Sequence, residues 1–127
     1  MALIKTRSKR KATGGRYIPF RKKRKEEKAN LPTATKLKAK KVKFVRVRGG
    51  NLKHRLLGAD QINLYDPKAK TYIKAKIEVV LENPANRHYP RRNILTKGTI
   101  VNTEKGKARI TNRPGQENTV NAILLGK

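Results

Sequence analysis

Few residues of this chain have side chains suited to catalysis or metal binding. It contains two histidines, His54 and His88, and no cysteine, so neither a thiolate zinc site nor a disulfide framework is available. His54 alternates with two leucines and is expected to be an interior or interfacial histidine. No Ser-His-Asp arrangement is visible, and the acids outside the basic N-terminal third are scattered: Asp60, Asp66, Glu78, Glu82, Glu104 and Glu117. The sequence therefore predicts no enzyme, no metal site, no cofactor and no small-molecule substrate.

The charge of the chain indicates a different kind of function. The 34 Lys and Arg residues outnumber 8 Asp and Glu residues, which leaves a net charge of +26. Such a chain repels itself, and it gains affinity for a polyanion by releasing the counterions condensed on phosphates. An ordinary solvated basic surface is the alternative, but the imbalance is too large for a surface of scattered lysines. The sequence predicts a nucleic-acid partner.

The first basic cluster lies near the N-terminus and contains a pair of glycines. Glycine lets the backbone approach a phosphate closely, and adjacent N–H groups can bind its oxygens. The Lys-Ser/Thr ending of a nucleotide-binding P-loop is missing. A polybasic tail without fixed structure is the alternative, and a nuclear address is compatible with either function. The residues expected to contact RNA here are Arg7, Lys9, Arg10, Lys11, Gly14, Gly15 and Arg16.

Two aromatic residues, Tyr17 and Phe20, interrupt the basic segment. Such rings can stack on unpaired bases, or they can anchor the segment on protein, and both alternatives stay open. A second basic run follows within residues 21–29, which contain good helix formers and are compatible with a short helix. Tyr17 is included among the RNA contacts, together with the basic residues Arg21, Lys22, Lys23, Arg24 and Lys25.

Residues 82–93 form a long loop that is rich in Arg and Asn. Loops of this length in compact domains tend to be functional, because most connections are shorter. Arginine forks match phosphates, and Asn can contact sugars or base edges. The alternative is a solvated connection between strands. The loop residues expected to contact RNA are Asn86, Arg87, His88, Tyr89, Arg91 and Arg92.

A third basic group flanks the turn Gly49-Gly50. A hairpin at this turn is expected to gather the group into one patch, although an ordinary solvated face is the alternative. Its members are Arg46, Arg48, Lys53 and Arg55.

Composition divides the chain near Lys41. Residues 1–41 carry 16 basic and 2 acidic residues, whereas residues 42–127 carry 18 and 6. The first part lacks apolar periodicity and is expected to be an extended basic N-terminal arm, which orders on its partner. The second part is expected to be a β-domain that packs a small aliphatic core, since only 5% of the residues are aromatic.

Residues 42–127 read as short strands separated by turn signals. The clearest is Thr71–Leu81, in which Ile73, Ala75, Ile77, Val79 and Leu81 are expected to share the core face. Gly58 is expected to interrupt the strand that begins at Leu52, and Asp66-Pro67-Lys68 is a turn. The predicted fold is all-β, a small antiparallel six-stranded β-barrel. The other strands expected are Val42–Arg48, Leu52–Leu57, Gln61–Tyr65, Ile94–Val101 with a break at Lys97-Gly98, Lys107–Thr111 and Thr119–Leu125.

No apolar run approaches the roughly 18 residues that a membrane span requires. The first residues, Met1 to Lys5, lack the apolar stretch of a signal peptide. A cytoplasmic protein is expected, or a nuclear one if the cell has a nucleus.

Several segments resemble one family, the eight-e proteins of the small ribosomal subunit found in archaea and eukaryotes. The similar segments are Lys11–Arg16, Lys22–Lys25, Val45–Asn51, Glu82–Tyr89, Asn93–Gly98 and Thr111–Gln116, and the compact length is similar to the archaeal form. The resemblance covers almost the whole chain. Arg113, which lies in the last of these segments, is also among the expected RNA contacts. It implies a structural protein of the cytoplasmic ribosome, with small-subunit ribosomal RNA and neighbouring ribosomal proteins as partners. A DNA-compacting protein and a ribosome-assembly factor remain the alternatives.

Overall fold

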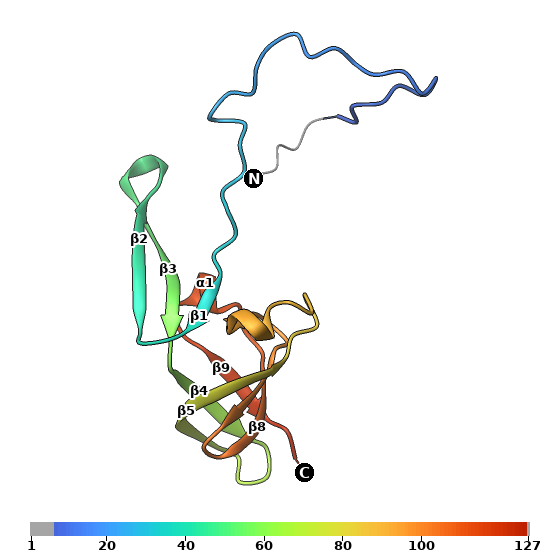
Figure 1. Ribbon diagram of the computed structural model, residues 1–127. Helices are drawn as coiled ribbons and strands as arrows, with labels where there is room; N and C mark the ends of the chain where they lie inside the picture. The colour runs from blue at the N-terminus through green and yellow to red at the C-terminus, as the bar shows by residue number, and fades with distance from the viewer. Residues whose placement is uncertain (1–6, 127) are drawn as a thin grey trace. The chain divides into compact units, whose positions relative to one another are not determined.

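The computed structural model describes residues 7–126, and the chain divides into two units, Met1–Pro32 and Thr33–Lys127. The second unit is almost entirely β-structure (Figure 1). Its short helices are the single turns η1 (Arg48–Gly50) and η2 (Pro90–Arg92) and the four-residue helix α1 (Pro114–Glu117). Its strands are β1 (Thr35–Leu37), β2 (Lys41–Arg46), β3 (Leu52–Ala59), β4 (Gln61–Asp66), β5 (Thr71–Glu82), β6 (Ile94–Leu95), β7 (Ile100–Thr103), β8 (Gly106–Ile110) and β9 (Asn121–Leu124).

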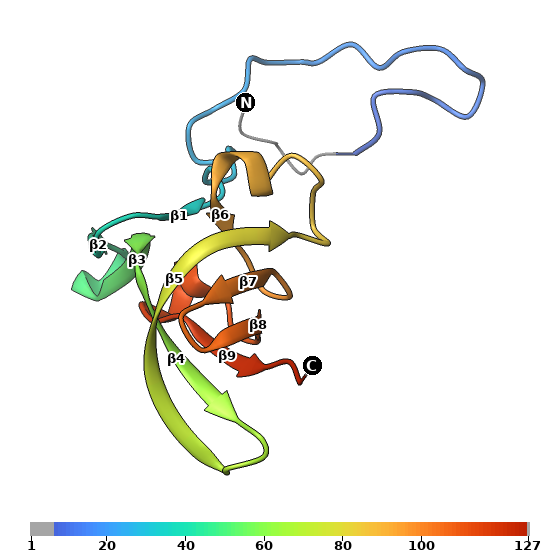
Figure 2. The ribbon, with the colours of Figure 1, turned by 60° about the horizontal axis from the view of Figure 1, so that its bottom comes forward.

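Five of these strands close into a barrel in the order β4-β5-β7-β8-β9. The long strand β5 pairs with β4 along its first half and with β7 along its second half, and Figure 2 shows its curved path. The last seam joins β4 to β9 in parallel, with Asn63 opposite Asn121. The predicted all-β barrel class is confirmed. The barrel has five strands where six were expected, and one seam is parallel.

The inward face of β5 agrees with the predicted alternation only at Ala75 and Ile77, since Ile73, expected on the same face, is 38% exposed. Ala75 and Ile77 are buried, but Val80 takes the next core position while Val79 and Leu81 are exposed. The register between β5 and β7 shifts between Ile77 and Val79, which is a β-bulge. A bulge inserts one extra residue, so it exchanges the two faces of the strand beyond it.

The remaining strands form a second sheet in the order β2-β3-β1-β6. Strand β1 was not predicted, and it pairs in parallel with β3 and antiparallel with β6. Thr35 in β1 is fully buried, and its hydroxyl donates a hydrogen bond to the Leu56 carbonyl at 2.8 Å. Residues 33–41, expected in the arm, therefore lie in the folded unit.

Strand β3 runs through Gly58, which was expected to interrupt it. The backbone of Gly58 faces Lys36 on one side and Lys41 on the other. A Cβ atom at this position would lie 2.6 Å from Lys38 Cγ and 2.8 Å from the Ala39 carbonyl oxygen. Glycine is present here because the connection between β1 and β2 crosses directly over the strand.

The core is small and aliphatic, as the composition predicts. Among the described residues, no aromatic side chain belongs to the buried core. Its largest fully buried apolar members are Leu56, Ile62, Leu64, Leu95, Val101 and Ile110.

The described part of the first unit, residues 7–32, contains a single isolated β-bridge, between Arg10 and Arg16, and otherwise turns and bends. Residues 21–29 form no helix in the chain by itself, where like charges one turn apart oppose one. No helix within residues 7–126 has the length and apolar character needed to cross a bilayer. Those same residues contain no cluster of His, Cys, Asp and Glu able to hold a metal ion. The expectation that Met1 to Lys5 are not part of a signal peptide concerns residues that lie outside the described part of the chain.

Candidate nucleic-acid interface

The first basic cluster folds into a tight reversal of the backbone. The Lys11 amide donates to the Gly15 carbonyl at 2.8 Å, and the Tyr17 amide donates to the Lys9 carbonyl at 3.0 Å. Gly14 has a φ of 85°, a conformation that glycine adopts without steric cost. The turn thus brings the basic residues on both of its sides onto one small, exposed segment.

Tyr17 is held by its basic neighbours. The guanidinium carbon of Arg7 lies 3.9 Å from the centroid of the Tyr17 ring, and Lys11 Nζ lies 5.6 Å from it. These distances are typical of cation–π contacts. Phe20, by contrast, is 90% exposed, with the Arg21 guanidinium 5.2 Å from its ring. Of the two rings, Phe20 is the more open to a stacking partner.

The second basic run is closed by an acidic residue. Glu27 forms a salt bridge with Arg21, and its carboxylate also accepts a hydrogen bond from the Arg24 amide at 3.3 Å. The Arg24 amide hydrogen bond, followed by the hydrogen bond from the Arg21 side chain and the charges of Arg21 and Arg24, holds the pKa of Glu27 below its ordinary value of 4.5. This turn leaves the side chains of Lys22, Lys23 and Lys25 exposed.

The loop after β5 is built around a buried amide. Asn83 is 7% exposed, and its Nδ2 donates to the Ile94 carbonyl at 3.2 Å. Its Oδ1 accepts hydrogen bonds from the Ala85 amide and the Thr96 hydroxyl, both at 3.0 Å. Asn83 therefore organises the loop and has no side-chain atom to offer a ligand.

The remainder of the loop presents cations to solvent. Asn86 Oδ1 accepts the His88 amide at 2.8 Å, so Asn86 also supports the loop backbone. The loop ends in η2, and Asn93 then adopts a left-handed conformation with φ 51°. Tyr89 is half-buried, and the exposed basic or imidazole side chains are Arg87, His88, Arg91 and Arg92.

The hairpin β2–β3 divides its basic residues between two faces. Directly opposite residues of an antiparallel pair share a face, and here Lys43 lies opposite Arg55 and Val45 opposite Lys53. Arg46 lies opposite Leu52, on the other face. The predicted single patch of four cations is therefore wrong, because Arg46 is one residue out of phase with Lys53 and Arg55.

Three further residues of the prediction have clear positions. Arg48 lies in η1 at the tip of the hairpin, and Arg113 precedes α1; both are exposed. His54 was expected to be interior or interfacial; it is not interior, since it is exposed and packs edge-on against Phe44 with ring centroids 4.9 Å apart.

One group of outward side chains was missed by the sequence analysis. Asn63 and Tyr65 of β4 lie beside Tyr72 and Lys74 of β5 and beside Asn121 of β9. Alternation in β5 marks Tyr72 and Lys74 as exposed, but their neighbours depend on the register of β4 with β9, which the sequence does not reveal.

Few of the cations have an acidic partner. Between described residues, which include 32 of the 34 basic residues, the structure contains one salt bridge, the pair Arg21–Glu27. The fold and these surfaces define a class: a small β-barrel protein with a basic segment, whose positive charge is largely uncompensated within the chain.

The comparison with known proteins identifies the family. The family model of ribosomal protein S8e matches residues 4–125. Small ribosomal subunit protein eS8 of Sulfolobus acidocaldarius is 50% identical over 126 residues, covering 98% of this chain and 98% of that protein. The proteins of the same name from Picrophilus torridus and Methanococcus aeolicus are 46% and 48% identical, covering 98% and 100% of this chain and 100% of each relative. The chain belongs to the ribosomal protein S8e family.

Proposed function

We propose that this protein is a structural constituent of the small ribosomal subunit, which binds and stabilises folded small-subunit ribosomal RNA. Membership of the family assigns a ribosomal, non-enzymatic role in the cytoplasm. Its partners are then ribosomal RNA and neighbouring ribosomal proteins. The contacts with RNA phosphates are the part of the proposal that goes beyond the family.

The observation that carries these contacts is that few basic side chains of the described residues form a salt bridge with a carboxylate. A protein that used its cations to stabilise itself would pair them with carboxylates, and the described residues contain one such pair. Cations that remain in water until an RNA arrives release its condensed counterions on binding. This supports the basic segment of residues 9–25, the loop of residues 83–93 and the hairpin as phosphate contacts.

The loop supports this role particularly well because its framework and its cations are separate. Asn83 and Asn86 hold the backbone, while Arg87, Arg91 and Arg92 remain exposed. A loop whose conformation is already fixed loses less entropy on binding than a flexible one. Guanidinium groups on such a loop can meet phosphates bidentately.

Sedimentation tests the ribosomal role directly. A cell extract is separated on a sucrose gradient after a high-salt wash, and the fractions are probed for this chain. The expected result is retention in the mature small subunit. Appearance only in precursor particles would identify an assembly factor instead. Sedimentation with DNA would refute the ribosomal role.

A further inference from the structure

The outer face of the barrel carries two short rows of side chains across β5, β4 and β9. Tyr72, Tyr65 and Ile123 are directly opposite one another in register and make the first row. Lys74, Asn63 and Asn121 make the second row. The two rows are two residues apart along each strand, about 7 Å.

The first row provides an aromatic surface. The Tyr65 and Tyr72 rings lie 4.9 Å apart between centroids, at an interplanar angle of 40°. Tyr65 is partly buried, whereas Tyr72 is 80% exposed. Tyr65 thus packs against the Tyr72 ring, and most of the apolar surface of that ring remains exposed to solvent. A supported, exposed ring is a stacking surface, and every nucleobase has a face that can stack on it.

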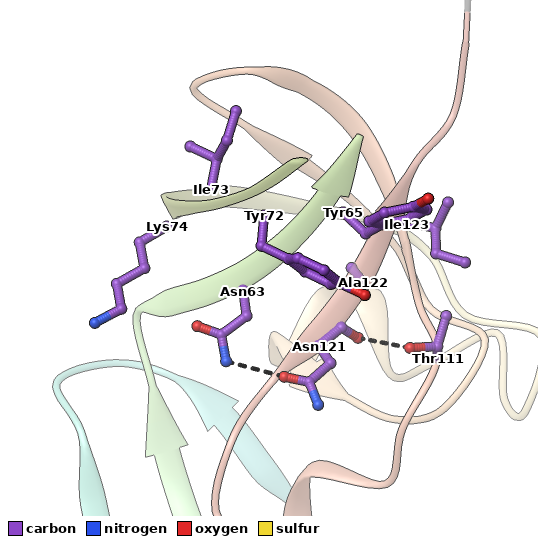
Figure 3. Close-up of a pocket in the computed structure, with 9 residues that line it drawn as sticks. All are labelled: Asn63, Tyr65, Tyr72, Ile73, Lys74, Thr111, Asn121, Ala122 and Ile123. Carbon is purple, nitrogen blue, oxygen red and sulfur yellow. Dashed lines mark hydrogen bonds between the residues drawn. The ribbon is translucent and has the colours of Figure 1, made fainter. Parts of the chain in front are cut away.

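The second row provides hydrogen-bonding groups. Asn63 Nδ2 donates to Asn121 Oδ1 at 3.0 Å (Figure 3). Among the described residues, Asn63 Oδ1 and Asn121 Nδ2 have no hydrogen-bond partner. Exchanging O and N in both amides keeps the bond between them, and again leaves one acceptor and one donor. This combination matches the edge of a base, which also presents donors and acceptors.

The two rows line a single hollow on the surface of the barrel. Its volume is about 570 Å³, which lies within the range of pockets that hold small ligands. The side chain of Lys74 lies in its lining, and Arg109 continues the tyrosine row on β8, opposite Ile123. The nearby charge is therefore positive, which favours an occupant that carries phosphate.

We propose that this hollow binds one unpaired RNA base, which stacks on Tyr72 while its edge meets Asn63 and Asn121 and its phosphate approaches Lys74. The inference rests on the proposed function and adds a base-binding subsite to a protein otherwise expected to contact phosphates. A neutral peptide segment would use the tyrosines, but it would leave Lys74 without a partner. Sequence-independent stacking with few hydrogen bonds is typical of sites that bind single-stranded RNA.

Two RNA hairpins that differ in one base test the subsite. The first carries a single bulged adenosine, and the second carries an abasic ribose at the same position, so their phosphates are the same. The full chain is expected to bind the adenosine hairpin about 5- to 150-fold more tightly, because stacking on an aromatic residue contributes about 1–3 kcal/mol per base. Fluorescence anisotropy at about 0.2 M salt, where phosphate contacts are weakened, measures both affinities.

Substitutions assign the preference to the hollow. Tyr72→Leu should remove the preference for adenosine and leave the affinity for the abasic hairpin unchanged. Tyr72→Phe keeps the ring and should keep the preference. Phe44→Leu is the matched control, since Phe44 is 60% exposed on the hairpin β2–β3 and should not affect the preference. Because Tyr72 and Phe44 are exposed, these variants are expected to fold, which circular dichroism checks.

Three outcomes separate this inference from the proposed function. Equal binding of both hairpins by the wild-type chain would overturn the subsite and favour a peptide of a neighbouring protein as its occupant. A preference that survives in Tyr72→Leu would also overturn it. A third outcome is a preference that depends on Tyr72, together with a duplex DNA of equal length that binds as tightly as the adenosine hairpin. This outcome would support the subsite and refute the ribosomal RNA function.

Discussion

At the scale of single residues, polar side chains in similar sequence surroundings have different tasks. The loop after β5 contains three asparagines, of which Asn86 was predicted to contact RNA. Asn83 is buried and makes three hydrogen bonds within the protein. Asn86 supports the adjacent turn, and Asn93 takes up the left-handed backbone conformation after η2. The sequence identifies such residues as loop formers, but their separate tasks depend on which backbone groups surround them.

The lowered pKa of Glu27 predicts that the turn in the basic segment depends on pH. Its pKa is lowered by the Arg24 amide and by the charges of Arg21 and Arg24. A carboxylate with a lowered pKa stabilises the folded conformation above its unperturbed pKa, and this stabilisation is lost as the pH falls through the lowered value. Residues 24–28 should therefore keep their turn above pH 4.5 and lose it at more acidic pH.

NMR measurements check this prediction. The Arg24 amide chemical shift should titrate together with the Glu27 side-chain carboxylate. Glu27→Gln should abolish the titration of the Arg24 amide, whereas Glu26→Gln, one residue earlier, should leave it. A titration midpoint for Glu27 at or above its ordinary value of 4.5 would contradict the prediction.

At the scale of elements, strand β3 depends on the absence of a side chain at Gly58. A Cβ atom there would lie 2.8 Å from the Ala39 carbonyl oxygen, so Gly58→Ala must displace backbone. We expect a destabilisation of about 1–3 kcal/mol, the usual cost of overpacking. Urea unfolding monitored by circular dichroism measures it. Gly15→Ala is the matched control, because its Cβ would meet no atom closer than 3.7 Å; an equal effect of both substitutions would refute the explanation.

Removing the arginines of the loop after β5 is expected to change how RNA affinity depends on salt concentration. Each phosphate neutralised by a basic side chain contributes about 0.7 to 0.9 to the slope of log affinity against log salt concentration. Replacing Arg87, Arg91 and Arg92 by Ala should therefore lower the slope for a small-subunit RNA fragment by about 2 to 3. The same three residues replaced by Lys keep the charge and should keep the slope. An unchanged slope in the alanine variant would remove the loop from the interface.

Local sequence patterns predicted the strands well where the chain keeps one periodicity. They predicted the strands less well where pairing with a distant strand determines the structure. Alternation located β5, and the Asp66 turn forms as expected, with the Lys68 amide donating to Asp66 Oδ1 at 2.9 Å. The bulge beyond Ile77 and the three-residue strand β1 escaped detection, since both depend on partners distant in sequence. The family resemblance supplied the expected function, whereas the hollow beside Tyr72 required the register of three strands.

At the scale of the whole molecule, charge governs stability. A net charge of +26 with one salt bridge between described residues means that self-repulsion opposes the compact state. Raising the ionic strength from about 0.01 M to about 0.15 M shortens the screening length from about 30 Å to about 8 Å. The melting temperature should therefore rise with NaCl, by about 4 °C or more if screening contributes 1 kcal/mol.

Differential scanning calorimetry across this salt range checks the expectation. A variant with the exposed residues Lys68, Lys97 and Lys105 replaced by Gln carries less charge and should show a smaller rise. A melting temperature that fell or stayed constant with salt would show that repulsion does not limit the stability of the fold.

The parallel seam between β4 and β9 has a consequence for the order of events during synthesis. Asn63 and its partner Asn121 are 58 residues apart, so the barrel stays open until translation has passed residue 121. Closing a seam between such distant segments is slow compared with forming local turns. The turn around Gly14 has only local contacts and can form as soon as it is synthesised. A nascent chain therefore exposes its basic segment while its β-domain is still incomplete, so the RNA binding proposed for this segment would precede folding.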